Sequence, residues 1–129
     1  MKTLRVFAMM ALMVMTSNVY GQQKDPPMIE DSNYLVIFYA PWCGPCKTLK
    51  REVLDTDYKK DLENMFTWVY HLNAEDHKNS QLVQAAKVTV YPSTCVFKLK
   101  NGKFVLLKKE SGYTNPERFV EKLRVWRNK

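Results

Sequence analysis

Strand-like and helix-like patterns alternate in the first half of the chain. Residues 34–40, Tyr-Leu-Val-Ile-Phe-Tyr-Ala, form an uninterrupted apolar run that predicts a buried strand. After position 46, apolar residues recur at helical spacing, and this helix is expected to end near 56–57. A short amphipathic segment, 61–66, precedes a second predicted strand at 68–73, which is rich in aromatic and apolar residues. The order strand, helix, strand predicts a parallel pair with a right-handed crossover.

The second half of the chain predicts a helix, a hairpin and a final helix. The first of these helices covers about 77–87 and is followed by a loop that leads to Pro92. Strands at 94–100 and 103–109 flank Asn101-Gly102, a dipeptide typical of a tight hairpin turn, so they should be antiparallel neighbours.

The final helix begins at Asn115-Pro116-Glu117, where proline suits the first turn. Its apolar stripe consists of Phe119, Val120, Leu123 and Trp126. Strands that alternate with helices place the chain in the α/β class, and no internal repeat or low-complexity segment interrupts it.

The N-terminus has the features of an export signal. Lys2 and Arg5 precede an apolar stretch at 6–15, and small Val19 and Gly21 fit the positions before a cleavage site. We therefore expect a cleavable signal peptide at 1–21 and a periplasmic or secreted mature protein. A permanent membrane anchor is the alternative, but ten apolar residues fall short of the roughly 20 that a spanning helix needs.

The remaining 108 of 129 residues are enough for one domain and too few for two. The polar segment 22–33 contains Pro26-Pro27 and is interpreted as a linker, which leaves 34–129 as the domain.

Charge does not indicate a nucleic-acid partner. Lys and Arg number 20 and Asp and Glu 13; the segment 1–21 holds two basic residues and no acidic one, so the mature chain has 18 against 13, a net charge of about +5. The lysines are scattered, without a basic stripe interleaved with aromatic residues. They are best explained as solvated surface charge, with a weak preference for acidic partner surfaces as the alternative.

Two cysteines, Cys43 and Cys46, lie at the predicted junction between the first strand and its helix. A helix N-terminus favours negative charge, and the thiolate is the nucleophile of disulfide exchange. Cys43 is therefore expected to be the more acidic and more exposed nucleophile. Cys46, one turn further along, is expected to resolve a mixed disulfide. Pro45 lacks an N–H group and so fits the first helical turn between them.

Other uses of the pair have less support. A structural zinc site would need two more ligands, and only Cys95, His71 and His77 remain, without a second close cysteine pair. Covalent haem attachment would need histidine at the position of Lys47. A purely structural disulfide closes too short a loop to add much stability. We expect no metal, and no organic cofactor because the chain has no glycine-rich phosphate loop.

Cys95 is the third cysteine and stands in the apolar strand predicted at 94–100. This position favours an inert buried thiol. A free reactive thiol or an intermolecular link is the alternative that an odd cysteine in an exported protein leaves open.

These motifs and their order resemble the thioredoxin family from about residue 33 to 126. Residues 38–47, Phe-Tyr-Ala-Pro-Trp-Cys-Gly-Pro-Cys-Lys, are similar to its active-site segment, and 90–94, Val-Tyr-Pro-Ser-Thr, to its loop with a cis-proline. Asn101-Gly102 is similar to the family's hairpin turn and 111–113 to its glycine region. The resemblance implies a thioredoxin-like fold, a central mixed sheet of about four to five strands flanked by helices.

The resemblance also implies roles for several residues. Pro92 would shape a substrate groove opposite the cysteines, and the backbone of Tyr91 would pair with an extended substrate peptide. A trans proline that merely ends the loop is the alternative. The remaining residues that would shape the active site are Trp42, Gly44 and Pro45.

Two positions depart from the family pattern. Thioredoxins usually bury an acidic residue six positions before the first cysteine, where this chain has Ile37, and the partner lysine corresponds to His71. Without that carboxylate the proton of the resolving thiol must pass to another acceptor, so resolution should slow near neutral pH. A histidine within a strand is more often a satisfied packing residue than a base.

The sequence therefore predicts an exported thiol–disulfide oxidoreductase that reduces or isomerises disulfides in other proteins, acting as a monomer. The resemblance implies a membrane thiol relay as electron donor. A peptide-binding or chaperone-like module with little turnover is the main alternative. A dedicated step such as reduction of haem-binding cysteines is another, although no insertion marks it.

Overall fold

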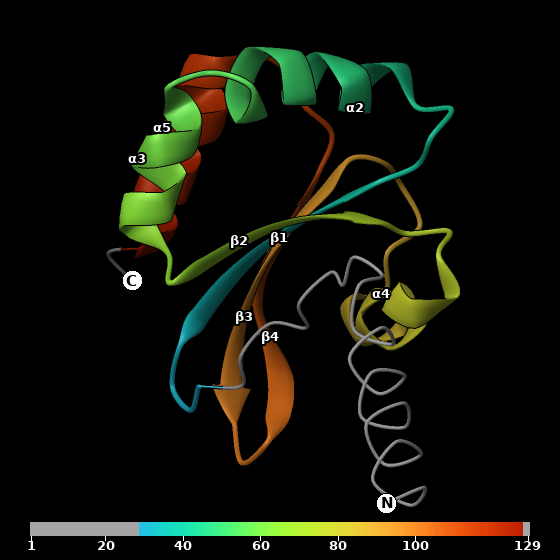
Figure 1. Ribbon diagram of the computed structural model, residues 1–129, viewed down its shortest axis with the longest axis vertical. Helices are drawn as coiled ribbons and strands as arrows, with labels where there is room; N and C mark the ends of the chain where they lie inside the picture. Colours follow the sequence, from blue (N-terminus) through green and yellow to red (C-terminus); the bar gives the residue numbers. More distant parts are fainter. Residues whose placement is uncertain (1–28, 128–129) are drawn as a thin grey trace, which may run out of the picture.

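The computed structural model describes residues 29–127 and shows a four-stranded sheet between helices (Figure 1). The elements in chain order are β1 (Asn33–Tyr39), α2 (Gly44–Leu49), the π-helical turn η2 (Lys50–Leu54), α3 (Tyr58–Met65), β2 (Trp68–Asn73), the 3₁₀ turn η3 (His77–Asn79), α4 (Ser80–Ala86), β3 (Ser93–Lys100), β4 (Lys103–Ser111) and α5 (Pro116–Arg127). The predicted signal peptide, 1–21, and linker residues 22–28 lie outside the described residues.

The strand order is β2-β1-β3-β4. β1 pairs with β2 in parallel and with β3 antiparallel, and β3 pairs with β4 antiparallel. The predicted parallel pair and hairpin are both confirmed. At the hairpin turn Asn101 and Gly102 have φ values of 53° and 75°, the backbone that this dipeptide adopts readily.

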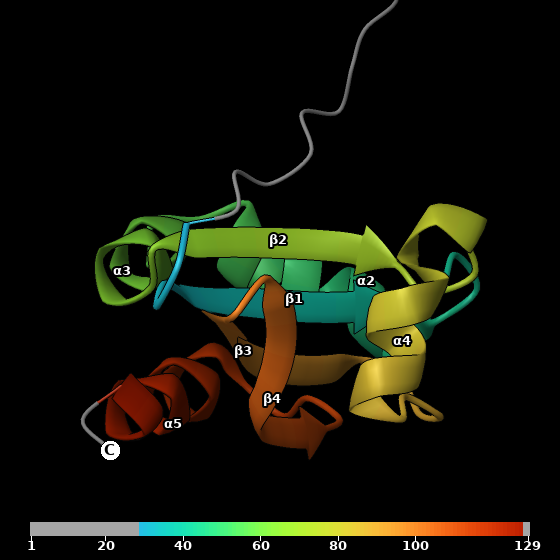
Figure 2. The ribbon, with the colours of Figure 1, turned by 90° about the horizontal axis from the view of Figure 1, so that it is seen from below.

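The two faces of the sheet carry separate cores, because successive residues of a strand point to opposite sides. On one face Leu35 and Ile37 of β1 pack with residues of α2, η2, α3 and α5. On the other, Val36 and Phe38 pack with Ala86 of α4 and with β3. The ribbon shows this arrangement, with α3 and α5 on one side of the strands and α4 on the other (Figures 1 and 2). The central strand β1 is thus buried on both faces.

Helix boundaries differ slightly from the predictions. The segment expected to be helical from 61 is helical from Tyr58, and the expected helix 77–87 is a 3₁₀ turn followed by α4, which ends where Lys87 takes φ 51°. The domain is hydrogen-bonded from Ile29 onward: Asp31 N–H donates to Leu99 O over 2.9 Å, and Asn101 N–H to Glu30 Oε1 over 2.6 Å. The last residues of the predicted linker therefore pack on the β3–β4 hairpin.

Candidate active site

The two cysteines lie where β1 gives way to α2. Cys43 is the N-cap residue of the helix, and its Sγ accepts a hydrogen bond from Cys46 N–H over 3.2 Å. Pro45 stands in the first turn, where an N–H group would have no intrahelical partner. A negative charge on Cys43 would be stabilised by this N–H and by the helix N-terminus. The predicted location of the pair is confirmed.

The cysteines form a disulfide, with their Cα atoms 5.3 Å apart. Tyr39, Ala40 and Tyr91 pack around the two sulfur-bearing side chains. Cys43 is 4% exposed and Cys46 3%, so the expected difference in exposure is not visible in this oxidised state. The neighbouring Gly44 and Pro45 are exposed.

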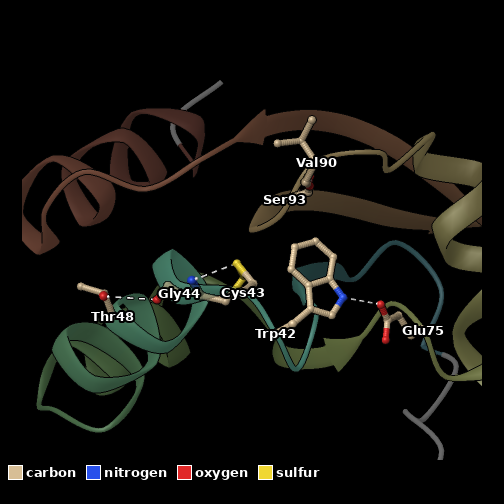
Figure 3. The surroundings of a disulfide bond; sticks show 8 residues. Trp42, Cys43, Gly44, Thr48, Glu75, Val90 and Ser93 are labelled. Carbon is tan, nitrogen blue, oxygen red and sulfur yellow. Dashed lines mark hydrogen bonds between the residues drawn. A yellow bond between two sulfur atoms is a disulfide. The ribbon is translucent and has the colours of Figure 1, made fainter.

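A second loop reaches the same place from the far end of α4. The Tyr91–Pro92 peptide bond is cis, as the resemblance implied, and Tyr91 packs against the cysteine cluster. Two hydrogen bonds hold the loop: Ser93 Oγ donates to Val90 O over 2.5 Å, and Gly112 N–H donates to Pro92 O over 2.8 Å. Val90 is about half exposed at this rim (Figure 3).

Trp42 lies beside the disulfide with 68% of its surface exposed. Its indole Nε1 donates to Glu75 Oε1 over 2.6 Å (Figure 3). Its ring meets that of Tyr91 edge-on at a centroid distance of 5.7 Å. Sequence reasoning missed Glu75, because nothing local distinguishes it from other acidic residues near a helix start. Only the fold brings it to Trp42.

Three residues that are neighbours across β2, β1 and β3 form a row in the sheet; the middle one packs against α2. Ile37 of β1 lies between His71 of β2 and Thr94 of β3, and its side chain is fully buried in the core that includes Leu49 of α2. The position of the family's usual buried acid is thus apolar. Nε2 of His71 and Oγ1 of Thr94 are buried without a hydrogen-bond partner among residues 29–127.

His71 packs, but it is not a satisfied polar residue. Its ring lies 4.2 Å from that of Tyr39 at an angle of 32°. Burial, together with the charge of nearby Lys50, lowers the pKa of His71 from 6.5 to about 4, against a small opposing effect of Asp55. The imidazole is therefore neutral at physiological pH. The prediction that it packs is confirmed, and the expectation that its hydrogen bonds are met within the domain is wrong.

Cys95 is fully buried as a free thiol on β3. Burial raises its pKa from 9.0 to about 11, and Lys109 opposes this only in part. The prediction that Cys95 is buried is confirmed, and because the thiolate is the reactive form, this thiol is expected to react slowly near neutral pH. Within residues 29–127 no three His, Cys, Asp or Glu side chains cluster as metal ligands would, and no helix there is long and apolar enough to cross a bilayer.

Residues 28–125 match the family of thioredoxin-like domains. The chain belongs to this thioredoxin-like family. A thioredoxin-like protein of Acanthamoeba polyphaga mimivirus is 34% identical over 79 residues, 59% of this chain and 53% of that protein, so the chain spans about half the length of this curated relative.

Solved thioredoxins have the same fold. The thioredoxin of Trypanosoma brucei brucei is 28% identical, with a TM-score of 0.54 over 79% of this chain and 80% of its own. That of Thermus thermophilus is 20% identical, with a TM-score of 0.61 over 74% and 73%. A thioredoxin-like fold that holds Cys43 and Cys46 at disulfide distance supports thiol–disulfide chemistry.

Proposed function

We propose that the chain is an exported thiol–disulfide oxidoreductase that reduces or isomerises disulfides of other proteins. The observation that carries this proposal is the Cys43–Cys46 disulfide, which caps a helix N-terminus beside the cis-Pro92 loop. Export is supported by the predicted signal peptide at 1–21.

The reaction starts from the reduced pair. The Cys43 thiolate attacks one sulfur of a substrate disulfide, and the other substrate sulfur leaves as a thiolate that takes up a proton. Cys46 then loses its proton and attacks Cys43 Sγ, which releases the second substrate thiol. Two electrons have passed to the substrate, and the enzyme is left with the disulfide seen here. A thiol relay outside the cytosol would have to supply those electrons in the next cycle.

The surface around the dithiol has features that suit a polypeptide substrate. Trp42 and Val90 offer exposed apolar surface near the dithiol (Figure 3). Tyr91, in the cis-Pro92 loop, packs against both the cysteines and the ring of Trp42. An extended peptide can pair with backbone groups at such a loop while its side chains contact the apolar rim. A binding module with little turnover is the second candidate, favoured by the apolar Ile37 where a proton acceptor would be expected.

An insulin disulfide-reduction assay separates the two candidates. We expect Cys43→Ser and Cys46→Ser each to abolish turnover, whereas Cys95→Ser, which removes the buried third thiol, should leave it unchanged. Equal activity in the wild type and both active-site variants would contradict redox catalysis and favour the binding module.

N-terminal sequencing of protein recovered outside the cytosol tests the predicted cleavage and should find Gln22 first. Recovery of an intact N-terminus would contradict cleavage.

The reduction potential of the Cys43–Cys46 pair decides whether it reduces or oxidises its substrates. We expect a value near the roughly −270 mV of reducing thioredoxins rather than the roughly −120 mV of strong oxidants, measured by equilibration with glutathione.

A further inference from the structure

A groove lies between α5, the end of β4 and the loop 111–114, and the dithiol contributes no residue to it. Its volume is about 890 Å³, within the range of small-molecule sites. Thr94 of β3 is among the residues that line it and is 3% exposed. The proposed redox function makes no use of this groove.

The inner wall of the groove is apolar and aromatic. Leu123 is buried, while Phe119 and Trp126 are partly exposed along the same side of α5. Tyr113 packs edge-on against Phe119, with ring centroids 5.9 Å apart, which fixes one end of the wall. An apolar body that lies against this wall could therefore gain by leaving water.

The charges that line the groove leave one cation uncompensated. Lys122 pairs with Glu110, and Glu121 pairs with Arg124 over 3.0 Å. The guanidinium of Arg118, which also lines the groove, makes no ion pair or hydrogen bond within residues 29–127; only its backbone N–H is bonded, to Asn115 Oδ1. A guanidinium presents a planar fork of donors that matches a carboxylate.

We propose that this groove binds an amphipathic monocarboxylate, with its carboxylate on Arg118 and its apolar body against Leu123 and Trp126. A single negative charge suits the site, because the carboxylates of Glu110 and Glu121 also line it and would repel a polyanion such as a nucleotide. The groove and the dithiol use different residues, so this inference is independent of the proposed redox function.

Decanoate is a suitable probe, with decanol as its uncharged analogue. Isothermal titration of the mature chain should show saturable 1:1 binding of decanoate and at least about tenfold weaker binding of decanol. Arg118→Gln should weaken decanoate binding by about tenfold, whereas Arg127→Gln, on the same helix but outside the groove, should leave it unchanged. Cys43→Ser should bind decanoate as the wild type does.

Amide NMR spectra locate the site and check folding in the same samples. Binding should shift the signals of Leu123 and Trp126, and the free Arg118→Gln variant should keep the wild-type pattern elsewhere. Absence of saturable binding up to millimolar decanoate would overturn the proposal. So would equal binding of decanol, equal loss in both arginine variants, or self-association that buries Trp126 in place of the ligand.

Discussion

Ile37 is the residue whose chemistry matters most for the rate of the proposed cycle. It lies fully buried on the sheet face that α2 covers, between His71 and Thr94. His71 is neutral and its pKa is about 4, so it accepts a proton poorly near neutral pH. We therefore predict that the proton of Cys46 leaves by another route and that the attack on a mixed disulfide is slow near neutral pH.

Ile37→Asp should accelerate release of a mixed disulfide from Cys43 by about two orders of magnitude near pH 7, the lower end of what a positioned base supplies. The cost should be about 3 kcal/mol of stability, because a polar group replaces a packed core side chain. Stopped-flow thiol release across pH 6–9 measures the effect. Ile37→Asn introduces a similar side chain that does not titrate, and an equal acceleration there would contradict a role for the proton acceptor.

Thr94 lowers the stability of the fold, because its Oγ1 is buried without a hydrogen-bond partner in the described domain. Thr94→Val keeps the shape and removes the unpaired hydroxyl, so it should stabilise the fold by about 1 kcal/mol. Urea unfolding at pH 7 measures the gain. Thr89→Val, at an exposed loop position, should stay within about 0.5 kcal/mol of wild type. A loss of stability in Thr94→Val would show that the hydroxyl is hydrogen-bonded in solution.

At the scale of elements, side-chain contacts join segments that no strand pairing connects. Tyr113 Oη donates to Glu52 Oε1 over 2.9 Å, which ties the loop before α5 to the π-helical turn behind the active-site helix. Burial, reinforced by this bond and by the charge of Glu52, raises the pKa of Tyr113 well above 10.0, so the hydroxyl remains a donor. The edge strand β4 is similarly tied to α4 by Lys109.

Lys109 Nζ donates to Ala86 O over 3.0 Å and to Lys87 O over 3.1 Å, and so caps the C-terminus of α4. Lys109→Met should destabilise the domain by about 1 kcal/mol, because two helix-end carbonyls lose a charged donor. Lys108→Met is the matched control. Lys108 precedes Lys109 in the strand, and its side chain is exposed and makes no such bond among the described residues. Equal unfolding midpoints for the two variants would show that the cap contributes nothing.

At the scale of the whole molecule, His71 couples stability to pH. Its pKa is about 4 in the fold and 6.5 in an exposed reference, so the unfolded chain binds more protons between those values. The contribution of His71 to stability is therefore fully present above about pH 6.5 and falls as the pH drops toward 4.

His71→Phe keeps an aromatic ring against Tyr39 and removes the titrating group. The fall in the urea midpoint between pH 7 and pH 5 should be smaller in this variant than in the wild type. His77→Phe, which changes the exposed second histidine, should keep the wild-type slope. Identical pH slopes for His71→Phe and wild type would show that His71 titrates normally.

The sequence by itself determined the elements and the chemistry, because both depend on local patterns. The apolar run at 34–40 is typical of a strand buried on two faces, and Asn101-Gly102 favours its turn whatever surrounds it. The Cys-Gly-Pro-Cys segment predicted a dithiol at a helix start for the same reason.

Tertiary structure decided what depends on neighbours distant in sequence. The fold brings Glu75 to Trp42, and it buries His71, which makes that histidine a weak base. It also pairs Glu110 with Lys122 and Glu121 with Arg124, so Arg118 has no ion pair among residues 29–127. The difference in exposure expected between Cys43 and Cys46 is likewise absent, because Tyr39 and Tyr91 enclose both sulfurs. Burial and charge pairing are properties of the assembled surface, and local sequence does not contain them.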